Sequence, residues 1–213
     1  MTAPITSVVF DLGGVLIDVN PDYLYRKLIP DEKERRDFLT NVCSREWGRR
    51  LDEGISFAEN AKVLLQKYSG DPHMQSLIRA WDKRLGEMFA GPVQGTVDIL
   101  EELNDANIPL YALTNMSEEE ISLEWKLFPF YALFKDMVVS AVERVMKPDP
   151  KIYEILLNRT KIDPRRSIYI DDRAENLPPA AALGFTTILF TTPEALRAEL
   201  IRHNLPLLKR CAS

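Results

Sequence analysis

The segment Val8-Val9-Phe10-Asp11-Leu12-Gly13-Gly14-Val15-Leu16 decides how the chain is interpreted. Its apolar start predicts a short buried strand. The two glycines predict a tight turn in which the backbone can approach a ligand closely. Asp11 then stands at the carboxyl end of a strand, where open α/β sheets bind ligands. Such a carboxylate can act as a nucleophile that forms a covalent intermediate, or it can simply cap the turn. The rest of the chain decides between these two roles.

Four further apolar runs predict buried strands, and helical patterns separate them. The runs are residues 110–113, 137–140, 167–170 and 186–190. Helices are predicted over residues 96–106, after Ser117, over residues 150–157 and after Thr192-Pro193. Alternating strands and helices of this kind predict an α/β fold, with a Rossmann-like parallel sheet and helices on both faces.

The segment from about Asp18 to Met88 differs from the rest because it is charged, helical in pattern and without a convincing strand. We expect residues 1–17 and 90–213 to form the α/β core, and residues 18–89 to form a small inserted α-helical cap. An insertion rooted beside the carboxyl end of the first strand would lie over the active face, where it could exclude water and select substrates. A purely structural subdomain is the alternative.

Composition excludes several other classes of function. The 27 lysines and arginines face 32 aspartates and glutamates, a net charge of −5, which leaves no basic surplus for nucleic acid. No apolar run approaches the length that spans a membrane, and no signal-type start is present. Cys43 and Cys211 form neither a disulfide framework nor a metal-ligand spacing. We therefore expect a cytoplasmic protein with no nucleic-acid or membrane partner.

Two adjacent carboxylates, Asp171 and Asp172, follow the strand predicted at residues 167–170. Like charges packed together are unfavourable unless a cation neutralises them. A few carboxylates together with water and a substrate phosphate suit Mg²⁺. Asp11 could complete this site. The alternative is a solvated turn, which the other polar strand ends make the less favoured interpretation.

Polar side chains also follow the strand predicted at residues 110–113. Thr114 and Asn115 offer a hydroxyl and an amide just before the helix that begins after Ser117, and together they make an anion site. Lys147 precedes the predicted helix 150–157, and it could counter both a phosphate and the nearby carboxylates. These residues predict phosphate binding.

Taken in order along the chain, these residues resemble the four motifs of the haloacid dehalogenase superfamily, and the resemblance covers nearly the whole chain. The segments that carry it are Phe10-Asp11-Leu12-Gly13-Gly14-Val15-Leu16, Leu113-Thr114-Asn115, Lys147-Pro148-Asp149-Pro150-Lys151-Ile152-Tyr153, and Asp171-Asp172 with Asn176. They are most similar to bacterial sugar-phosphate phosphatases and to the phosphatase domain of soluble epoxide hydrolases. The insertion after the first motif resembles the small cap of this family.

The resemblance implies a covalent mechanism with a metal ion. Asp11 would attack phosphorus and become an aspartyl-phosphate. Mg²⁺ would bind the carboxylate of Asp11, the main-chain carbonyl of Gly13, and Asp172, with Asp171 binding directly or through water.

The resemblance also implies how the phosphate is held. Thr114 and Asn115 would bind its oxygens, while Lys147 would steady the nucleophile and the transferring group. This agrees with the physics of phosphoryl transfer, in which the protein mostly positions groups and neutralises charge.

One position departs from the family pattern. Most phosphatases of the family carry a second Asp two residues after the nucleophile, which protonates the leaving group and then activates water, whereas this chain has Gly13. Loss of a general acid–base typically removes a factor of about 10²–10⁴ in rate. A good leaving group, water or a cap residue would then have to supply the proton.

The sequence thus predicts a Mg²⁺-dependent phosphatase of small phosphorylated metabolites, with sugar phosphates among them, acting as a monomer or a homodimer. A 2-haloacid dehalogenase-type hydrolase that uses Asp11 on carbon is one alternative, since such enzymes also lack the second Asp. A catalytically weak module that binds phospho-ligands or proteins is the other, and Gly13 is the reason for it.

Overall fold

A five-stranded parallel sheet forms the centre of the protein, which is described here by a computed structural model covering residues 4–208. The strand order is β5-β4-β1-β6-β7, and all four pairings are parallel. The strands are β1 (Ser7–Phe10), β4 (Leu110–Thr114), β5 (Asp136–Val139), β6 (Ser167–Asp171) and β7 (Thr186–Leu189). The predicted parallel sheet is confirmed. Cys211 and the two chain ends lie outside the described residues.

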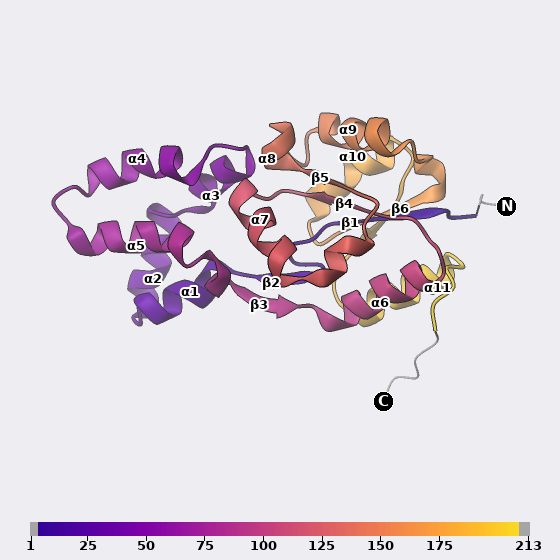
Figure 1. Ribbon diagram of the computed structural model, residues 1–213, viewed down its shortest axis with the longest axis horizontal. Coiled ribbons are helices and arrows are strands. Elements are labelled where there is room, and N and C mark those ends of the chain that lie inside the picture. Colours follow the sequence, from indigo (N-terminus) through magenta and orange to yellow (C-terminus); the bar gives the residue numbers. More distant parts are fainter. Residues whose placement is uncertain (1–3, 209–213) are drawn as a thin grey trace.

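Helices cover both faces of this sheet (Figure 1). Alternate residues of β1 point to opposite faces, so Val8 and Phe10 join one apolar core while Val9 joins another. The first core includes side chains of α6 (Gln94–Asp105) and α11 (Pro193–Arg202). The second includes side chains of α9 (Pro150–Thr160) and α10 (Leu177–Ala182). Burial on both sides explains why these strands are apolar along their whole length.

Five helices and a short 3₁₀ turn lie to one side of the sheet and have an apolar core of their own (Figure 1). They are α1 (Pro21–Leu28), α2 (Glu32–Asn41), α3 (Arg45–Asp52), α4 (Phe57–Lys67), α5 (Pro72–Lys83) and η1 (Leu85–Met88). We call residues 21–88 the helical unit. Its core is built around Tyr25, Trp47 and Ile78, and the ring of Trp47 packs edge-on against that of Trp81.

A small antiparallel sheet joins the helical unit to the α/β core. It pairs β2 (Ile17–Val19) with β3 (Phe89–Pro92), so Asp18 lies opposite Gly91. The expectation that no strand lies between about Asp18 and Met88 is therefore wrong at its start, where Asp18 and Val19 belong to β2. Each strand has only three or four residues, too few for a period-two pattern, and the partners are distant in sequence.

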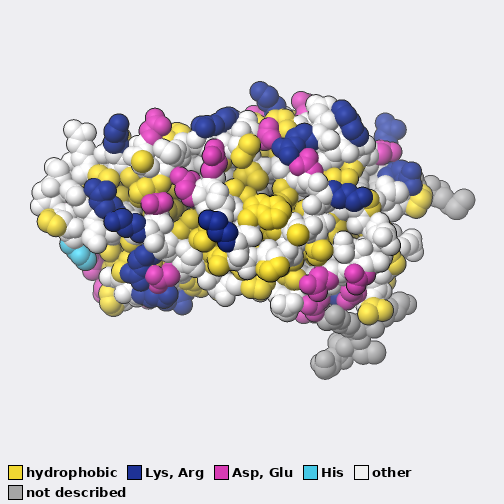
Figure 2. Space-filling view, in the orientation of Figure 1, with side chains coloured by type: hydrophobic (Ala, Val, Ile, Leu, Met, Phe, Trp, Pro, Cys, Tyr) yellow, Lys and Arg dark blue, Asp and Glu magenta, His cyan; other side chains and the backbone are white. Residues whose placement is uncertain are grey.

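The remaining elements complete the layers around the sheet. They are α7 (Glu118–Leu127), η2 (Pro129–Leu133), α8 (Ser140–Glu143), η3 (Pro164–Arg166) and η4 (Ala174–Asn176). The helix predicted after Ser117 begins with a capping box, in which the Ser117 hydroxyl accepts from the Glu120 N–H and the Glu120 carboxylate accepts from the Ser117 N–H. Among the described residues, no helix is long and apolar enough to cross a membrane. Figure 2 shows basic and acidic side chains interspersed on one face, with apolar side chains gathered near α7.

Candidate active site

Three carboxylates meet at the carboxyl edge of the sheet. Asp11 follows β1, Asp171 ends the neighbouring strand β6, and Asp172 comes directly after it. One oxygen of each lies within 4.8 Å of an oxygen of the others. The parallel pairing of β1 with β6 brings them together, as the sequence predicts, because parallel strands end at the same edge of a sheet.

Lys147 is the buried cation of this cluster. Its Nζ lies 2.9 Å from Asp11 Oδ1 and 2.7 Å from Asp171 Oδ2, and it also donates to the Leu113 carbonyl at 2.9 Å. The residue is only 2% exposed. Burial alone would lower the pKa of the ammonium, but the two carboxylates outweigh it, so the pKa of Lys147 is raised. A buried Lys147 therefore stays charged and fixes both carboxylates.

Asp171 is held on every side. Besides Lys147, it accepts hydrogen bonds from the Tyr169 hydroxyl at 2.5 Å, from the Arg173 N–H at 2.9 Å and from Asn176 Nδ2 at 2.9 Å. Burial raises the pKa of this carboxyl, but Lys147 and these donors outweigh burial, so the pKa of Asp171 is lowered. Asp171 is thus a fixed anion that orients Lys147.

Asp11 carries the opposite shift. Burial, opposed by Lys147 and reinforced by the charges of Asp171 and Asp172, raises its pKa to about 7. Three carboxylates share one lysine, so the cluster keeps an excess of negative charge. A divalent cation would neutralise that excess, and carboxylate oxygens are the ligands that Mg²⁺ prefers. The donor set therefore fits the expected metal, with Asp11 and Asp172 as carboxylate ligands.

The turn after β1 brings the backbone close to Asp172. Gly14 has φ +79°, and a Cβ atom there would lie 2.6 Å from Asp172 Oδ2. Only glycine tolerates both this positive φ and this close approach of Asp172. Gly13 has no such restriction, since its Cβ atom would meet only Val19 Cγ1 at 3.4 Å. Gly13 lines the same cavity as Asp11 and Asp172, which is where its predicted role as a carbonyl ligand requires it.

The two residues predicted to hold phosphate, Thr114 and Asn115, have different surroundings. Asn115 lines the cavity, but its side chain forms two hydrogen bonds with the backbone of Lys147, accepting from the N–H at 2.8 Å and donating to the carbonyl at 2.9 Å. Thr114 ends β4, is 1% exposed, and is not among the residues that line the cavity. Asn115 thus positions Lys147, a contact that the sequence does not reveal.

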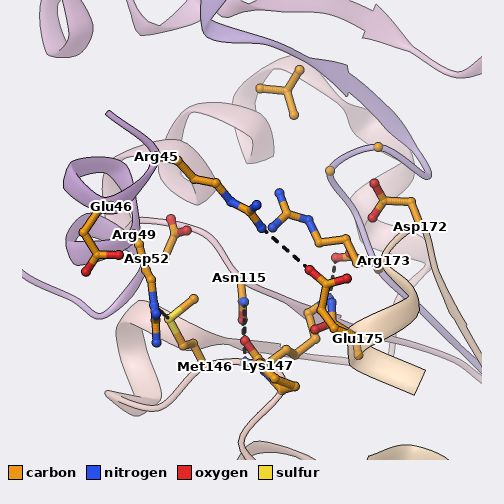
Figure 3. A pocket seen from close by; sticks show the side chains of 16 residues that line it. Arg45, Glu46, Arg49, Asp52, Asn115, Met146, Lys147, Asp172, Arg173 and Glu175 are labelled. Carbon is orange, nitrogen blue, oxygen red and sulfur yellow. Dashed lines mark hydrogen bonds and ion pairs between the residues drawn. The ribbon is translucent and has the colours of Figure 1, made fainter. Parts of the chain in front are cut away.

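A cavity of about 680 Å³ opens above the carboxylates, between the α/β core and the helical unit. Figure 3 shows Arg45, Glu46, Arg49 and Asp52 extending from α3 on one side, with Lys147, Asp172 and Arg173 on the other. The lining is completed by Val19, Met146, Pro148, Glu175 and Asn176. The cavity is therefore built jointly by both parts of the chain.

Sequence reasoning does not single out Arg45, Glu46 or Asp52. A signal for them exists in the pattern of α3, where Trp47 and Leu51 are buried four residues apart. Arg45, Arg49 and Asp52 follow the spacing i, i+4, i+7 and so share another stripe of the same helix. The pattern alone does not tell that this stripe faces the catalytic carboxylates.

The side chains that meet across the cavity are loosely paired. Arg45 pairs with Glu175 at 3.6 Å, and Arg49 Nε lies 3.3 Å from Met146 Sδ. Both members of the Arg45–Glu175 pair are exposed, which limits the free energy that the pair contributes.

The chain is similar in sequence to several known proteins. Residues 5–184 match the haloacid dehalogenase-like hydrolase family. Relatives include a sesquiterpene phosphatase of Aspergillus oryzae, 24% identical over 94% of this chain and 97% of its own. Acyl-CoA dehydrogenase family member 10 of Mus musculus is 40% identical over 91% of this chain, which spans only 18% of that protein. An (S)-2-haloacid dehalogenase of Burkholderia cepacia is 22% identical, over 88% of this chain and 84% of its own.

Solved structures share the fold. A predicted HAD-like hydrolase from Porphyromonas gingivalis superposes with a TM-score of 0.71 at 20% identity, covering 94% of this chain and 98% of its own. A HAD family enzyme from Bacteroides thetaiotaomicron, solved with magnesium and inorganic phosphate, gives a TM-score of 0.67 at 21% identity, covering 88% of this chain and 95% of its own.

Proposed function

The chain belongs to the haloacid dehalogenase-like hydrolase family, and from this premise we propose that it is a Mg²⁺-dependent phosphatase of small phosphorylated metabolites that acts through an aspartyl-phosphate on Asp11. The observation that carries the proposal is the buried Lys147, held between Asp11 and Asp171 beside Asp172. This arrangement supplies a nucleophile, a fixed cation and a cluster of carboxylates at one edge of the sheet.

Each residue has a definite part in the proposed reaction. Asp11 attacks phosphorus, and Lys147 holds the attacking carboxylate in place while it offsets charge on the transferring group. Asp171 holds the Lys147 ammonium group, and Asn115 holds the Lys147 backbone. Thr114 is proposed for phosphate binding only from the resemblance, because its buried position gives no independent support.

Magnesium is part of the proposal. The carboxylates of Asp11 and Asp172 and the carbonyl of Gly13 would hold the ion, and Asp171 would act directly or through water. When bound, Mg²⁺ supplies charge neutralisation for the phosphoryl group. The magnesium complex of the Bacteroides thetaiotaomicron enzyme supports this assignment.

The substrate class follows from the cavity. Its volume of about 680 Å³ lies within the range of small-molecule sites. Relatives named as phosphatases support phosphate esters as the substrates. One of these relatives is a phosphorylated carbohydrates phosphatase of Thermotoga maritima. We propose that residues 18–89 act as a cap over this cavity. The cytoplasmic location and the monomeric or homodimeric state remain expectations from the sequence.

A 2-haloacid dehalogenase-type hydrolase is the second candidate. Gly13 and the dehalogenase relative favour it, and the three-carboxylate cluster favours the phosphatase. A weak phospho-ligand or protein-binding module is the third candidate.

The experiment is phosphate release from a panel of metabolite phosphates, with and without Mg²⁺, beside halide release from 2-chloropropionate. We expect phosphate release that depends on Mg²⁺. Halide release that persists in a chelator would favour the dehalogenase, and binding of phosphate esters without turnover would favour the binding module.

A further inference from the structure

The carboxylic acids beside the nucleophile already have other roles. Asp11 itself attacks, Asp171 is fixed by four donors, and Asp172 is a proposed metal ligand. An alcohol leaves phosphorus poorly as an alkoxide, so a proton must reach the leaving oxygen from some other group. The position two residues after the nucleophile is Gly13, which has no side chain to supply it.

Three further carboxylic acids line the cavity: Glu46, Asp52 and Glu175. Glu46 and Glu175 are exposed, and Glu175 pairs with Arg45 at 3.6 Å. Asp52 is partly buried, and no hydrogen bond or ion pair ends on its carboxylate anywhere in residues 4–208. Its backbone is fixed instead, because the Ser140 hydroxyl donates to the Asp52 carbonyl at 2.6 Å. Asp52 is thus anchored at its backbone while its acid group is unengaged.

We propose that Asp52, at the end of α3, is the general acid–base of this site and takes the place of the group that Gly13 does not provide. The proposal rests on the phosphatase function proposed above. It assigns a catalytic residue to the helical unit, so both walls of the cavity would take part in the chemistry.

The surroundings of Asp52 favour a group that holds its proton at neutral pH. Burial and then the charge of Glu120 on α7 raise its pKa to about 8, with smaller contributions from Glu53 and Asp11, while Arg173 opposes the shift. Glu120 is itself held by the hydroxyl and the N–H of Ser117. A pKa near the working pH is what general acid–base catalysis requires.

The position of Asp52 also suits the leaving-group side of the site. In Figure 3 it lies on the α3 wall, across the cavity from Asp172. It also lines a second cavity of about 400 Å³, whose walls include Trp81 and Met88. Gly13, Asn115 and Arg173 line both cavities. Asp52 therefore stands where a leaving group would pass from the phosphate site into the helical unit.

The reaction balances with this one residue. An oxygen of Asp11 bonds to phosphorus, the bond from phosphorus to the leaving oxygen breaks, and Asp52 gives that oxygen its proton. Water then attacks phosphorus, the bond to Asp11 breaks, and the Asp52 carboxylate takes the proton from water. The sum is ester and water to alcohol and phosphate, with both aspartates restored.

The test compares two esters that differ in their need for an acid. Nitrophenolate leaves without a proton, whereas phenolate is as basic as a tyrosine side chain, with a pKa of about 10. In Asp52→Asn we expect kcat/KM for phenyl phosphate to fall by about 10²–10⁴, and kcat/KM for 4-nitrophenyl phosphate to fall by less than about tenfold. In the wild type, activity on phenyl phosphate should fall at high pH as Asp52 loses its proton. In Asp52→Asn this fall should be absent.

Three controls make the result decisive. Asp82→Asn makes the same change at an exposed site of the helical unit and should act as wild type on both esters. Asp52→Glu keeps an acid and should recover part of the phenyl phosphate activity. A thermal melt of each variant checks folding.

An equal loss on both esters, or no loss on either, would overturn the role of Asp52. If the wild type releases nothing from either ester, or if Asp11→Asn retains full release, the phosphatase proposal fails, and the role of Asp52 fails with it. Phosphate release by the wild type that depends on Asp11 therefore separates the two failures.

Discussion

The two walls of the cavity are built in different ways. The wall from the α/β core is buried and closely bonded, with Lys147 2% exposed and 2.7 Å from Asp171. The wall from α3 is open, and its Arg45 is exposed and lies 3.6 Å from Glu175. Groups that take part in bond making must be held rigidly, whereas groups that select among substrates can stay mobile. We infer that the core fixes the nucleophile and its cation, and that the exposed arginines of α3, Arg45 and Arg49, adapt the site to a substrate.

Removing Lys147 should break the rigid wall most severely. Lys147→Met leaves the carboxylates of Asp11 and Asp171 buried without their cation, and loss of one partner of a buried pair costs about 3–5 kcal/mol. We expect that loss in the free energy of unfolding from urea titration at pH 7, together with loss of turnover. Lys151→Met, at an exposed site on α9, is the matched control. A loss below about 1 kcal/mol, the range of an exposed pair, would show that this wall is no more rigid than the other.

The turn at Gly14 offers the next largest effect. In Gly14→Ala the new methyl group would press on the Asp172 carboxylate and strain a backbone with φ +79°. We expect the Mg²⁺ concentration needed for half-maximal activity to rise by about 10–100-fold, as for other disturbed ligand environments. Gly70→Ala, where nothing lies within 4 Å of the new Cβ atom, is the control. An unchanged Mg²⁺ requirement would remove Asp172 from the proposed metal site.

The buried Glu124 of α7 should make stability depend on pH. Burial raises its pKa from 4.5 to about 8, against the hydrogen bond from the Tyr131 hydroxyl. The folded state therefore binds the proton more tightly, so this contribution to stability is complete below pH 4.5 and is lost as the pH rises through about 8. Glu124→Gln should flatten the decline in urea midpoint between pH 5 and about 9. Glu118→Gln, exposed on the same helix, should keep the wild-type slope.

The loose wall should give the smallest change in stability. Arg45→Ala removes an exposed ion pair, so the free energy of unfolding should change by no more than about 0.5 kcal/mol. If α3 selects substrates, KM for the preferred ester should change while the activity toward 4-nitrophenyl phosphate stays within about threefold. A loss of stability as large as that of Lys147→Met would end the distinction between the two walls.

The features that the sequence predicts lie mainly in the core wall, and those that it does not predict lie mainly in the helical unit. The strand ends that carry Asp11 and Asp171 could be predicted because buried strands are continuous apolar runs and parallel strands end at one edge. The pairing of β2 with β3 could not, because its short strands leave no local pattern.

The contacts of single side chains were also beyond prediction. Asn115 bonds to the backbone of Lys147, and the acid of Asp52 faces the cavity, only because loops and helices distant in sequence pack together. Local sequence patterns thus predict most of the core wall, whereas the arrangement of the α3 wall depends on tertiary packing.

In the proposed mechanism Asp11 carries the phosphoryl group, and that group can be trapped and located. Wild-type protein mixed with Mg²⁺ and 4-nitrophenyl phosphate would be quenched in acid and its intact mass measured, followed by peptide mapping. We predict one added phosphoryl group on Asp11, and none in Asp11→Asn, which should also lose turnover. Full turnover in Asp11→Asn, with no adduct on the wild type, would contradict the covalent mechanism.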